Sequence, residues 1–224
     1  MLRKVPHKKV VRVSLPERLM RDAAVLGITL DAANATRLCT LLDELEKWNR
    51  KFNLTAIKGD EQMLTHHLLD SLAIHADLQG SRIADVGTGA GFPGLPLALV
   101  HPERHFTLID SNGKKIRFVT HAARLLKLAN VEPVQARAEE LKPATPFDTI
   151  VARACAPLPE LLNKVARLCG PHTRILAMKG KRPEAELASL PRAWQVLAVR
   201  SLEVPGLDAA RCLVTLAPAA TASA

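Results

Sequence analysis

The sequence predicts an α/β fold built around a mostly parallel sheet, and three observations lead to this expectation. After Gly80, short apolar runs alternate with helical segments, as in parallel strands joined by crossover helices. The first apolar run passes directly into a glycine-rich turn at residues 87–91. The last two runs are joined by Pro205-Gly206-Leu207-Asp208, which favours an antiparallel hairpin over another crossover. We therefore expect a seven-stranded sheet whose last two strands form a hairpin.

Residues 16–80 are predicted to form a helical extension that precedes this sheet. Apolar residues recur at three- and four-residue steps from Asp31 to Phe52, which predicts an amphipathic helix that Asp31 can cap. A second helix is predicted from Glu61 to about His75. Trp48 and Phe52 could stack on a base, but their spacing matches the core face of the first helix, and we expect them in the core.

Residues 81–217 are predicted to hold the sheet and its crossover helices. The strands are expected at seven apolar runs: Arg82–Val86, His105–Ile109, Val131–Gln135, Thr149–Ala152, Thr173–Met178, Trp194–Leu202 and Arg211–Leu216. Helices between them are clearest at Lys114–Leu128 and Pro159–Leu168. Residues 1–15 are interpreted as a basic flexible arm, and residues 218–224, which are small and polar, as a disordered tail.

Composition argues against several classes of protein. No apolar run approaches the roughly 20 residues needed to cross a bilayer, so we expect a cytoplasmic protein with no membrane partner. His66 and His67 lie on the second predicted helix with no third ligand in sight, so we expect packing residues rather than a metal pair. The cysteines also lack metal-ligand spacing, which favours reduced thiols over a disulfide framework or a zinc site. The four are Cys39, Cys155, Cys169 and Cys212.

The net charge of +9 suggests a polyanionic partner, because each basic side chain placed on a phosphate releases counterions. Charge alone does not separate RNA from DNA, or either of them from a solvated basic surface. Position adds to the argument, since the first twelve residues hold five basic side chains and no acid: Arg3, Lys4, Lys8, Lys9 and Arg12. We expect this arm to contact nucleic acid; a transit peptide fits less well, because the stretch is not rich in serine.

Asp85 and the glycines after it predict a site for a nucleotide-like cofactor. They lie at the carboxyl end of the first strand, where open parallel sheets bind their ligands. Gly87, Gly89 and Gly91 would let the backbone approach a cofactor without a Cβ clash. Asp85 can accept from the ammonium group of S-adenosylmethionine, a charge that pyrophosphate-bearing cofactors lack.

The same loop leaves a second cofactor class open, because residues 89–94 also satisfy the dinucleotide pattern G-x-G-x-x-G. Asp110 ends the second strand, where it would bind the ribose of either cofactor or cap the helix that begins near Lys114. Ala138 and Glu139 follow the third strand, where the loop backbone can meet an adenine edge, although Glu139 could simply start a helix. The closing hairpin, typical of Rossmann-like class I methyltransferases, favours S-adenosylmethionine over nicotinamide or flavin.

The segment after the fourth strand bears on the group that would be methylated. Amino-directed enzymes need a polar residue followed by Pro-Pro-aromatic there, whereas residues 152–157 read Ala-Arg-Ala-Cys-Ala-Pro. Cys155 has no neighbouring histidine or acid to form the thiolate that carbon-5 pyrimidine methylation requires. The N7 of guanine already presents a lone pair, so that positioning and exclusion of water suffice. We expect Arg153 to position the cofactor carboxylate or the RNA backbone, and we expect no general base.

Several dispersed motifs add a family resemblance over residues 38–216. The motifs are Trp48–Thr55, His67–Leu72, Asp85–Pro96, Asp110-Ser111, Arg153-Ala154 and Met178–Gly180. Together they resemble the bacterial small-subunit ribosomal RNA guanine-N7 methyltransferases, also called glucose-inhibited division protein B. The resemblance implies methyl transfer from S-adenosylmethionine to N7 of one guanosine in 16S ribosomal RNA, within the free RNA or the small subunit.

The resemblance also implies roles for individual residues. By it, Gly87, Phe92, Ala138, Glu139 and Arg153 would contact the cofactor, and Lys179 would lie near the RNA. No role carries over to the basic arm or the tail, which lie outside the matching region. We expect the protein to act as a monomer. Two alternatives stay open at this point: a nicotinamide-dependent oxidoreductase, and a non-catalytic RNA-binding module on the same fold.

Overall fold

The computed structural model describes residues 13–153 and 155–219. The basic side chains expected to contact nucleic acid, Arg3, Lys4, Lys8 and Lys9, lie outside the described residues, as does Arg12. The described part begins with Val13 and Ser14, just before the first helix.

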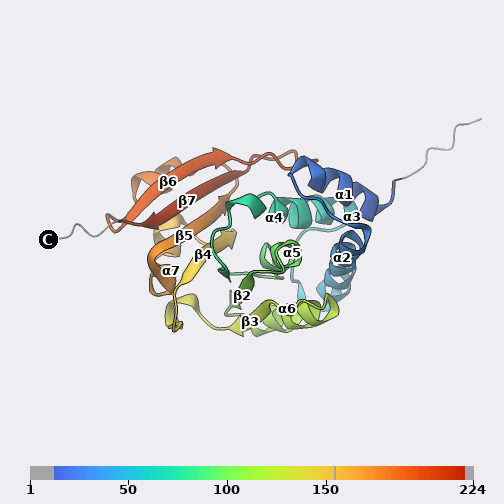
Figure 1. The fold of residues 1–224 in the computed structure, drawn as a ribbon, viewed down its shortest axis with the longest axis horizontal. Helices are drawn as coiled ribbons and strands as arrows, with labels where there is room; N and C mark the ends of the chain where they lie inside the picture. The colour runs from blue at the N-terminus through green and yellow to red at the C-terminus, as the bar shows by residue number, and fades with distance from the viewer. Residues whose placement is uncertain (1–12, 154, 220–224) are drawn as a thin grey trace, which may run out of the picture.

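Seven strands form one sheet in the order β3-β2-β1-β4-β5-β7-β6 (Figure 1). Strands β1 to β5 are parallel to their neighbours among themselves, and β7 is antiparallel to both β5 and β6. The strands are β1 (Arg82–Val86), β2 (His105–Asp110), β3 (Val131–Gln135), β4 (Phe147–Arg153), β5 (Cys169–Lys179), β6 (Trp194–Ser201) and β7 (Cys212–Pro218). The predicted fold class, a mostly parallel sheet that ends in an antiparallel hairpin, is confirmed.

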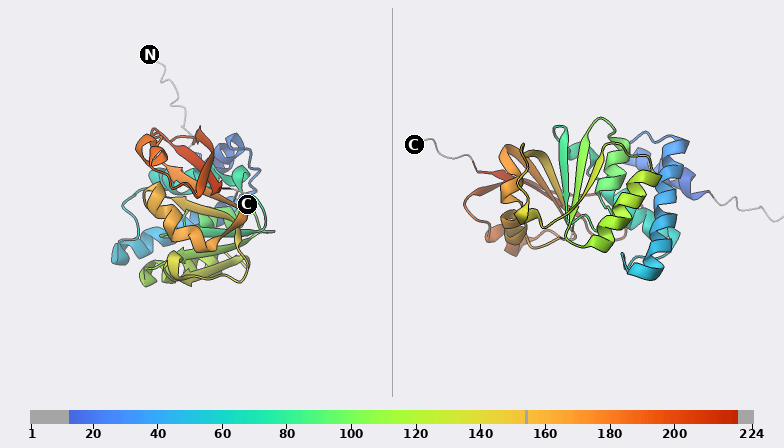
Figure 2. Two further views of the ribbon diagram at one scale, coloured as in Figure 1. Left: turned by 90° about the vertical axis from the view of Figure 1, so that its left-hand side faces the viewer. Right: turned by 90° about the horizontal axis from the view of Figure 1, so that it is seen from below.

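Helices cover both faces of the sheet. The α-helices are α1 (Leu15–Val25), α2 (Ala32–Phe52), α3 (Asp60–Met63), α4 (Asp70–Leu72), α5 (Gly94–Val100), α6 (Gly113–Leu125), α7 (Leu158–Val165) and α8 (Glu184–Ala188). A π-helical turn, η1 (Leu64–Leu69), joins α3 to α4, and short 3-10 turns are η2 (His75–Asp77), η3 (Ala138–Glu140) and η4 (Ala166–Leu168). Figure 2 shows α6 and α2 stacked outward from one face of the sheet, with α7 on the other.

Neighbouring strand residues point to opposite faces of the sheet, and this divides the core in two. Ile83 and Leu108 belong to one apolar cluster with α1, α2, α5 and α6. Ala84, Ile109 and Ile150 belong to a second cluster with α7. Strands covered on both faces need the continuous apolar runs that the sequence shows. The N-terminal helices therefore complete one of the two layers that cover the sheet.

Three helical segments differ from the sequence-based expectation. Helix α1 was not individually predicted, although Ser14 and Glu17 form a capping box at its start. The helix expected from Glu61 to about His75 ends as α4 at Leu72, and its middle is π-helical. The helix expected to reach Leu128 ends at Leu125, because Lys127 takes a left-handed conformation with φ 51°.

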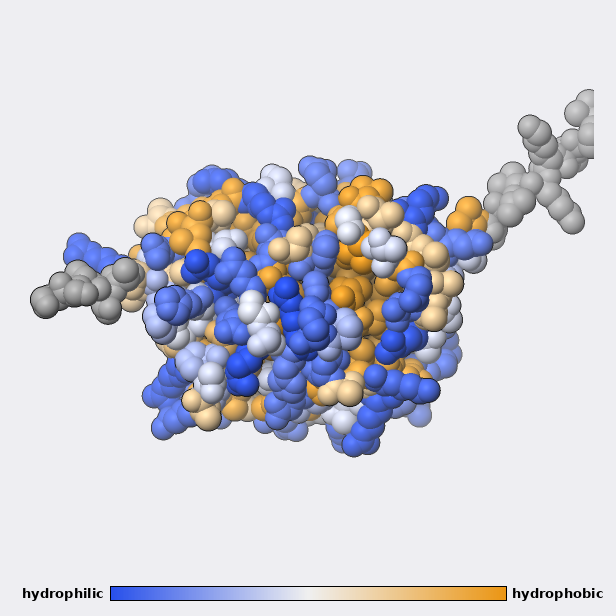
Figure 3. All heavy atoms as spheres, viewed as in Figure 1, coloured by the Kyte–Doolittle hydropathy of each residue, from blue (hydrophilic) through white to orange (hydrophobic). Residues whose placement is uncertain are grey.

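Apolar surface on the viewed face is most extensive in one region, with smaller apolar areas elsewhere, including the upper left (Figure 3). In Figure 3, hydrophilic residues cover most of the left side and the rim, and hydrophobic residues gather right of centre, where α2, α4 and α5 meet in Figure 1. Within the part of the chain that the structure describes, none of the helices combines the length and apolar character that a membrane crossing would require.

Candidate active site

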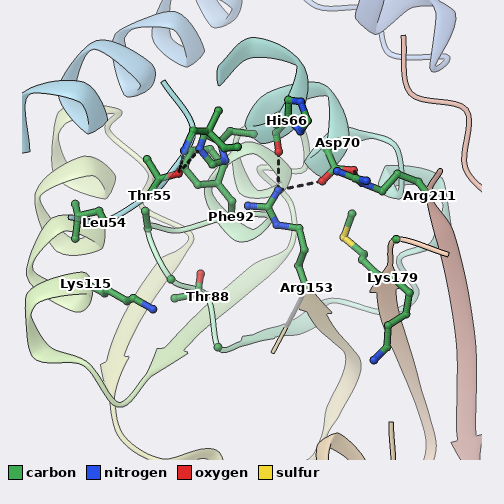
Figure 4. Close-up of a pocket in the computed structure, with 17 residues that line it drawn as sticks. Leu54, Thr55, His66, Asp70, Thr88, Phe92, Lys115, Arg153, Lys179 and Arg211 are labelled. Carbon is green, nitrogen blue, oxygen red and sulfur yellow. Dashed lines mark hydrogen bonds and ion pairs between the residues drawn. The ribbon is translucent and has the colours of Figure 1, made fainter. Parts of the chain in front are cut away.

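Two adjoining cavities open at the carboxyl edge of the parallel strands, with volumes of about 480 and 540 Å³. The first lies between the ends of β1, β4 and β5 and residues 54–70 of the extension, and Figure 4 shows it in close-up. The second lies between the ends of β2 and β3 and helix α7. Gly87 and Lys115 line both cavities. Open parallel sheets bind ligands at this edge, so the pair forms one candidate site.

Asp85 lies at the end of β1, beneath the glycine loop, and lines neither cavity. Its Oδ2 accepts from the hydroxyl of Thr88 at 2.6 Å and from the backbone N–H of Gly94 at 2.8 Å. Its Oδ1 is buried and has no hydrogen-bond partner among the described residues. Burial raises the pKa of this carboxyl to about 6. Asp85 thus stabilises the glycine loop through Oδ2, and its Oδ1 can accept a hydrogen bond from a further donor.

The three predicted glycines serve two purposes. Gly87 and Gly89 have φ values of 71° and 62° and line the first cavity with backbone. Gly91, with φ 87°, lines neither cavity, and a Cβ there would lie 2.3 Å from Cδ1 of Leu95. The turn and its close packing on α5 therefore explain the glycine at position 91. Its predicted contact with a cofactor stays a prediction.

Asp110 ends β2 on the wall of the second cavity. Its Oδ2 accepts from the N–H of Gly89 at 3.0 Å, and its Oδ1 from the N–H of Asn112 at 2.8 Å. The capping role considered for Asp110 belongs instead to Asn112, whose side chain accepts from the N–H of Lys114 at 2.9 Å. Asp110 therefore does not cap the helix, although its Oδ2 lies 3.7 Å from Nζ of Lys115 on α6, and it joins the glycine loop to the cavity.

The far wall of the second cavity comes from η3 and from the segment after β4. Ala138 and Glu139 lie on η3 and line the cavity, as the sequence suggested for a loop that meets a nucleobase. Cys155 lines the same cavity, beside Gly87. Burial raises the pKa of its thiol, so at neutral pH the residue is a thiol and a weak nucleophile.

Phe92 and His67 form an aromatic wall in the first cavity. Their rings stack with centroids 4.7 Å apart, and the His67 Nε2 lies 3.0 Å from the hydroxyl oxygen of Thr55. Burial, assisted by the nearby Arg153 charge, lowers the pKa of His67 to about 3, so the ring is neutral. We expected His67 to be a packing residue, and it both packs on Phe92 and lines the cavity.

Arg153 crosses the first cavity from the end of β4 towards the N-terminal extension (Figure 4). Its Nη1 donates to the carbonyl of His66 at 2.8 Å and to Oδ2 of Asp70 at 3.1 Å. The guanidinium carbon lies 5.8 Å from the centroid of the Phe92 ring. These contacts fix the guanidinium against the aromatic wall.

Lys179, at the end of β5, also lines the first cavity, on the β5 side of Arg153. Its Nζ donates to the carbonyl of Ala156 at 2.9 Å and to Oε2 of Glu186 at 2.7 Å. In Figure 4 its ammonium points away from Asp70. Lys179 thus joins β5 to α8 and to the segment after β4.

Most of the predicted residues meet at these two cavities, and the structure adds others. Thr55, Asp70, Lys115 and Arg211 also line the first cavity, yet no rule singled them out for binding. Arg211 stands just before β7, a position with no distinguishing sequence signal. Asp70 carried a weak signal, since a polar residue interrupts the apolar face of its helix.

Comparison with known proteins places this geometry among methyltransferases. Residues 34–214 match the family described as GidB, rRNA small subunit methyltransferase G. The chain is 46% identical over 200 residues to ribosomal RNA small subunit methyltransferase G of Escherichia fergusonii, covering 89% of this chain and 95% of that protein. It is 44% identical over 198 residues to the protein of the same name from Escherichia coli K12, covering 88% and 94%.

Solved structures share the fold at low sequence identity. TrmN from Thermus thermophilus superposes with a TM-score of 0.55 at 23% identity, covering 76% of this chain and 53% of that one. TYW2 of M. jannaschii, in complex with AdoMet, gives a TM-score of 0.53 at 15% identity, covering 66% and 74%. These similarities agree with the predicted fold class.

Proposed function

The chain belongs to the GidB family, the rRNA small subunit methyltransferases G, and from this premise we propose that it transfers a methyl group from S-adenosylmethionine to N7 of a guanosine in 16S ribosomal RNA. One observation carries the proposal. Every described residue that lines either cavity falls within the segment 34–214 that matches the family. The residues proposed to bind the cofactor and the RNA in the two cavities thus lie within the segment that matches the family.

The donor set of the second cavity fits S-adenosylmethionine. Asp110 offers carboxylate oxygens to ribose hydroxyls, and the backbone at Ala138 and Glu139 offers polar groups to adenine. The backbone of Gly87 and the side chain of Lys115 border both cavities, and Gly89 borders the first. The unpartnered Oδ1 of Asp85 can accept from a cationic donor, directly or through water. When bound, S-adenosylmethionine supplies an electrophilic methyl group.

The first cavity suits a target that needs no deprotonation. Asp70 is the one carboxylate among its described lining residues, and it is paired with Arg153 and Arg211. His67 is neutral and Phe92 is apolar, so this wall excludes water rather than exchanging protons. Guanine N7 already presents a lone pair, and catalysis then consists of positioning it towards the methyl group.

Four basic side chains line the same cavity, and we assign them to the RNA side of the reaction: Lys115, Arg153, Lys179 and Arg211. Arg153 would face both ligands, since it lies between the glycine loop and the extension. The arm residues Arg3, Lys4, Lys8 and Lys9 are proposed to add phosphate contacts from outside the cavity. The proposed substrate is the small-subunit RNA, free or in its particle, and the proposed enzyme acts as a cytoplasmic monomer.

Methyl transfer to defined RNA tests the proposal directly. Purified protein is incubated with tritiated S-adenosylmethionine and with either naked 16S RNA or small subunits from cells that lack the gene. Nuclease digestion and mass analysis should then find 7-methylguanosine at one position. Label on another base would contradict the N7 assignment. Calorimetry with NAD and with S-adenosylmethionine separates the oxidoreductase alternative, and tight RNA binding without transfer would favour the non-catalytic module.

A further inference from the structure

Asp70 joins three separate parts of the molecule through one buried carboxylate. It begins α4, and the residue is 2% exposed. Its Oδ2 accepts from Arg153 at the end of β4, and its Oδ1 accepts from Nε of Arg211, just before β7, at 2.8 Å. Figure 4 shows the two arginines reaching Asp70 from different sides. Both arginines line the first cavity, whereas their shared partner comes from the extension.

The π-helical turn η1 supplies a second anchor for Arg153. In an α-helix the N–H of residue 70 would donate to the carbonyl of residue 66. Here the N–H of Asp70 donates to the carbonyls of Thr65 and His67 and passes over that of His66. The His66 carbonyl accepts from Nη1 of Arg153 instead. The local departure from α-helical geometry therefore produces the acceptor that holds the arginine, in keeping with the frequent occurrence of π turns at functional sites.

Both arginines keep donors available after these contacts. A guanidinium carries five N–H donors. The hydrogen bonds of Arg153 to described residues involve Nη1 alone, and those of Arg211 involve Nε and Nη1. The Nη2 group of each is thus left for a ligand in the cavity that both residues line. Guanidinium groups fixed in orientation suit the paired oxygens of a phosphate.

We propose that Asp70 is a positioning residue for the methyl transfer: it orients Arg153 and Arg211 so that Arg211 binds a phosphate of the RNA substrate beside the target nucleotide. This inference rests on the proposed function and names the residues that hold its RNA. Both oxygens of Asp70 accept hydrogen bonds from the arginines, so we expect it to act through them. Its loss should therefore weaken RNA binding more than it slows the chemical step.

The chain contains a matched control for this role. Asp22 in α1 is also buried, at 7% exposure, and also bridges two arginines, with Nε of Arg18 at 3.3 Å and Nε of Arg21 at 2.9 Å. It lines neither cavity. Asp70→Asn and Asp22→Asn therefore remove the same kind of ion pair, one inside the proposed site and one outside it.

The test compares these variants in RNA affinity and in steady-state kinetics. Asp70→Asn should raise the Kd for small-subunit RNA and the KM by about tenfold, with a smaller change in kcat. Arg211→Ala should do the same, and the double variant should lose less than the product of the two single losses, because both changes remove the Asp70–Arg211 pair while Asp70→Asn also releases Arg153. Asp22→Asn should lower the melting temperature and leave Kd and KM at their wild-type values.

Three results would overturn the role of Asp70. One is wild-type Kd and KM in folded Asp70→Asn, and another is a double variant whose losses multiply. If Asp70→Asn does not fold, Arg211→Lys is tested in its place, because lysine keeps the charge but lacks the planar guanidinium group. A wild-type Kd for RNA in Arg211→Lys would be the third result that overturns the role. If the wild-type protein binds RNA but transfers no methyl group, the proposed function is contradicted but the role of Asp70 is not. The RNA affinities of wild type and Asp70→Asn still test that role.

Discussion

Arg153 is the single residue on which the proposed reaction depends most, because it contacts Asp70, His66 and the face of Phe92 at once. Arg153→Lys keeps the charge but loses the planar fork. We expect kcat/KM to fall by about 10- to 100-fold while the protein still folds. Steady-state kinetics with S-adenosylmethionine and small-subunit RNA measure the loss. Arg200→Lys is the control, because Arg200 pairs with Asp77 away from both cavities. Equal kinetics in the two variants would contradict the assignment.

His67 makes a prediction about stability and pH. Its folded pKa of about 3 lies below the ordinary value of 6.5, so the unfolded chain binds the proton more readily. Its contribution to stability is therefore present above pH 6.5 and is lost as the pH falls towards 3, by up to about 1.4 kcal/mol per pH unit. Asp85, whose pKa is raised to about 6, acts in the opposite direction. The comparison of wild type with His67→Gln isolates the histidine.

Urea unfolding of the two proteins at pH 7, 6, 5 and 4 measures this difference. His67→Gln should be less stable than wild type at pH 7, and the gap should shrink at each step below about pH 6.5. A gap of constant size would show that His67 takes up a proton as easily in the folded protein as in the unfolded chain. That outcome would also contradict the proposal that a neutral His67 forms part of the cavity wall.

Individual site residues differ in how far the sequence reveals them. Gly87, Asp110 and Arg153 stand directly after strands that the apolar pattern predicts, and strand ends converge at one edge of a parallel sheet. The pairing of Asp70 with Arg211 joins residues 141 positions apart. Only the packing of the extension against the hairpin brings these two together, and no spacing rule contains that information.

At the scale of elements, the capping box that begins α1 is a local feature with a local consequence. The backbone N–H and hydroxyl of Ser14 donate to the carboxylate of Glu17, and Glu17 donates its N–H to the hydroxyl of Ser14. Ser14→Ala should lower the free energy of unfolding by about 1 kcal/mol and leave kcat/KM unchanged, because α1 lines neither cavity. Chemical denaturation and methyl-transfer assays check both halves, and a loss of activity in the folded variant would tie α1 to the site.

The strands were predicted more accurately than the helical extension, for a physical reason. The buried parallel strands need largely apolar runs, and the runs predicted for them and for the closing hairpin coincide with the seven strands to within a few residues. The π turn spans 6 residues, too few to change the apolar periodicity of the segment, so residues 60–72 predict a plain helix. The π turn accompanies the tertiary contacts of the His66 carbonyl and Asp70 with Arg153, which no local pattern reveals.

At the scale of the whole molecule, the net charge of +9 predicts RNA binding that weakens with salt, because each phosphate contact releases counterions. The arm adds five basic residues to those that line the first cavity. If all five meet phosphates of single-stranded RNA, a chain without residues 1–12 should show a slope of log K against log salt that is shallower by up to about 3.5, or about 0.7 for each contact. Filter binding from about 50 to 200 mM salt measures the slope.

A second variant separates the charge of the arm from its length. Glutamine at positions 3, 4, 8, 9 and 12 keeps the chain intact and removes the same charges. If the arm acts through phosphate contacts, the two variants should share the shallower slope, and kcat at saturating RNA should stay near the wild-type value, because the described cavities are unchanged. A wild-type slope in both variants would restrict RNA recognition to the basic residues around the cavities. A loss of affinity with truncation alone would assign the effect to length rather than to charge.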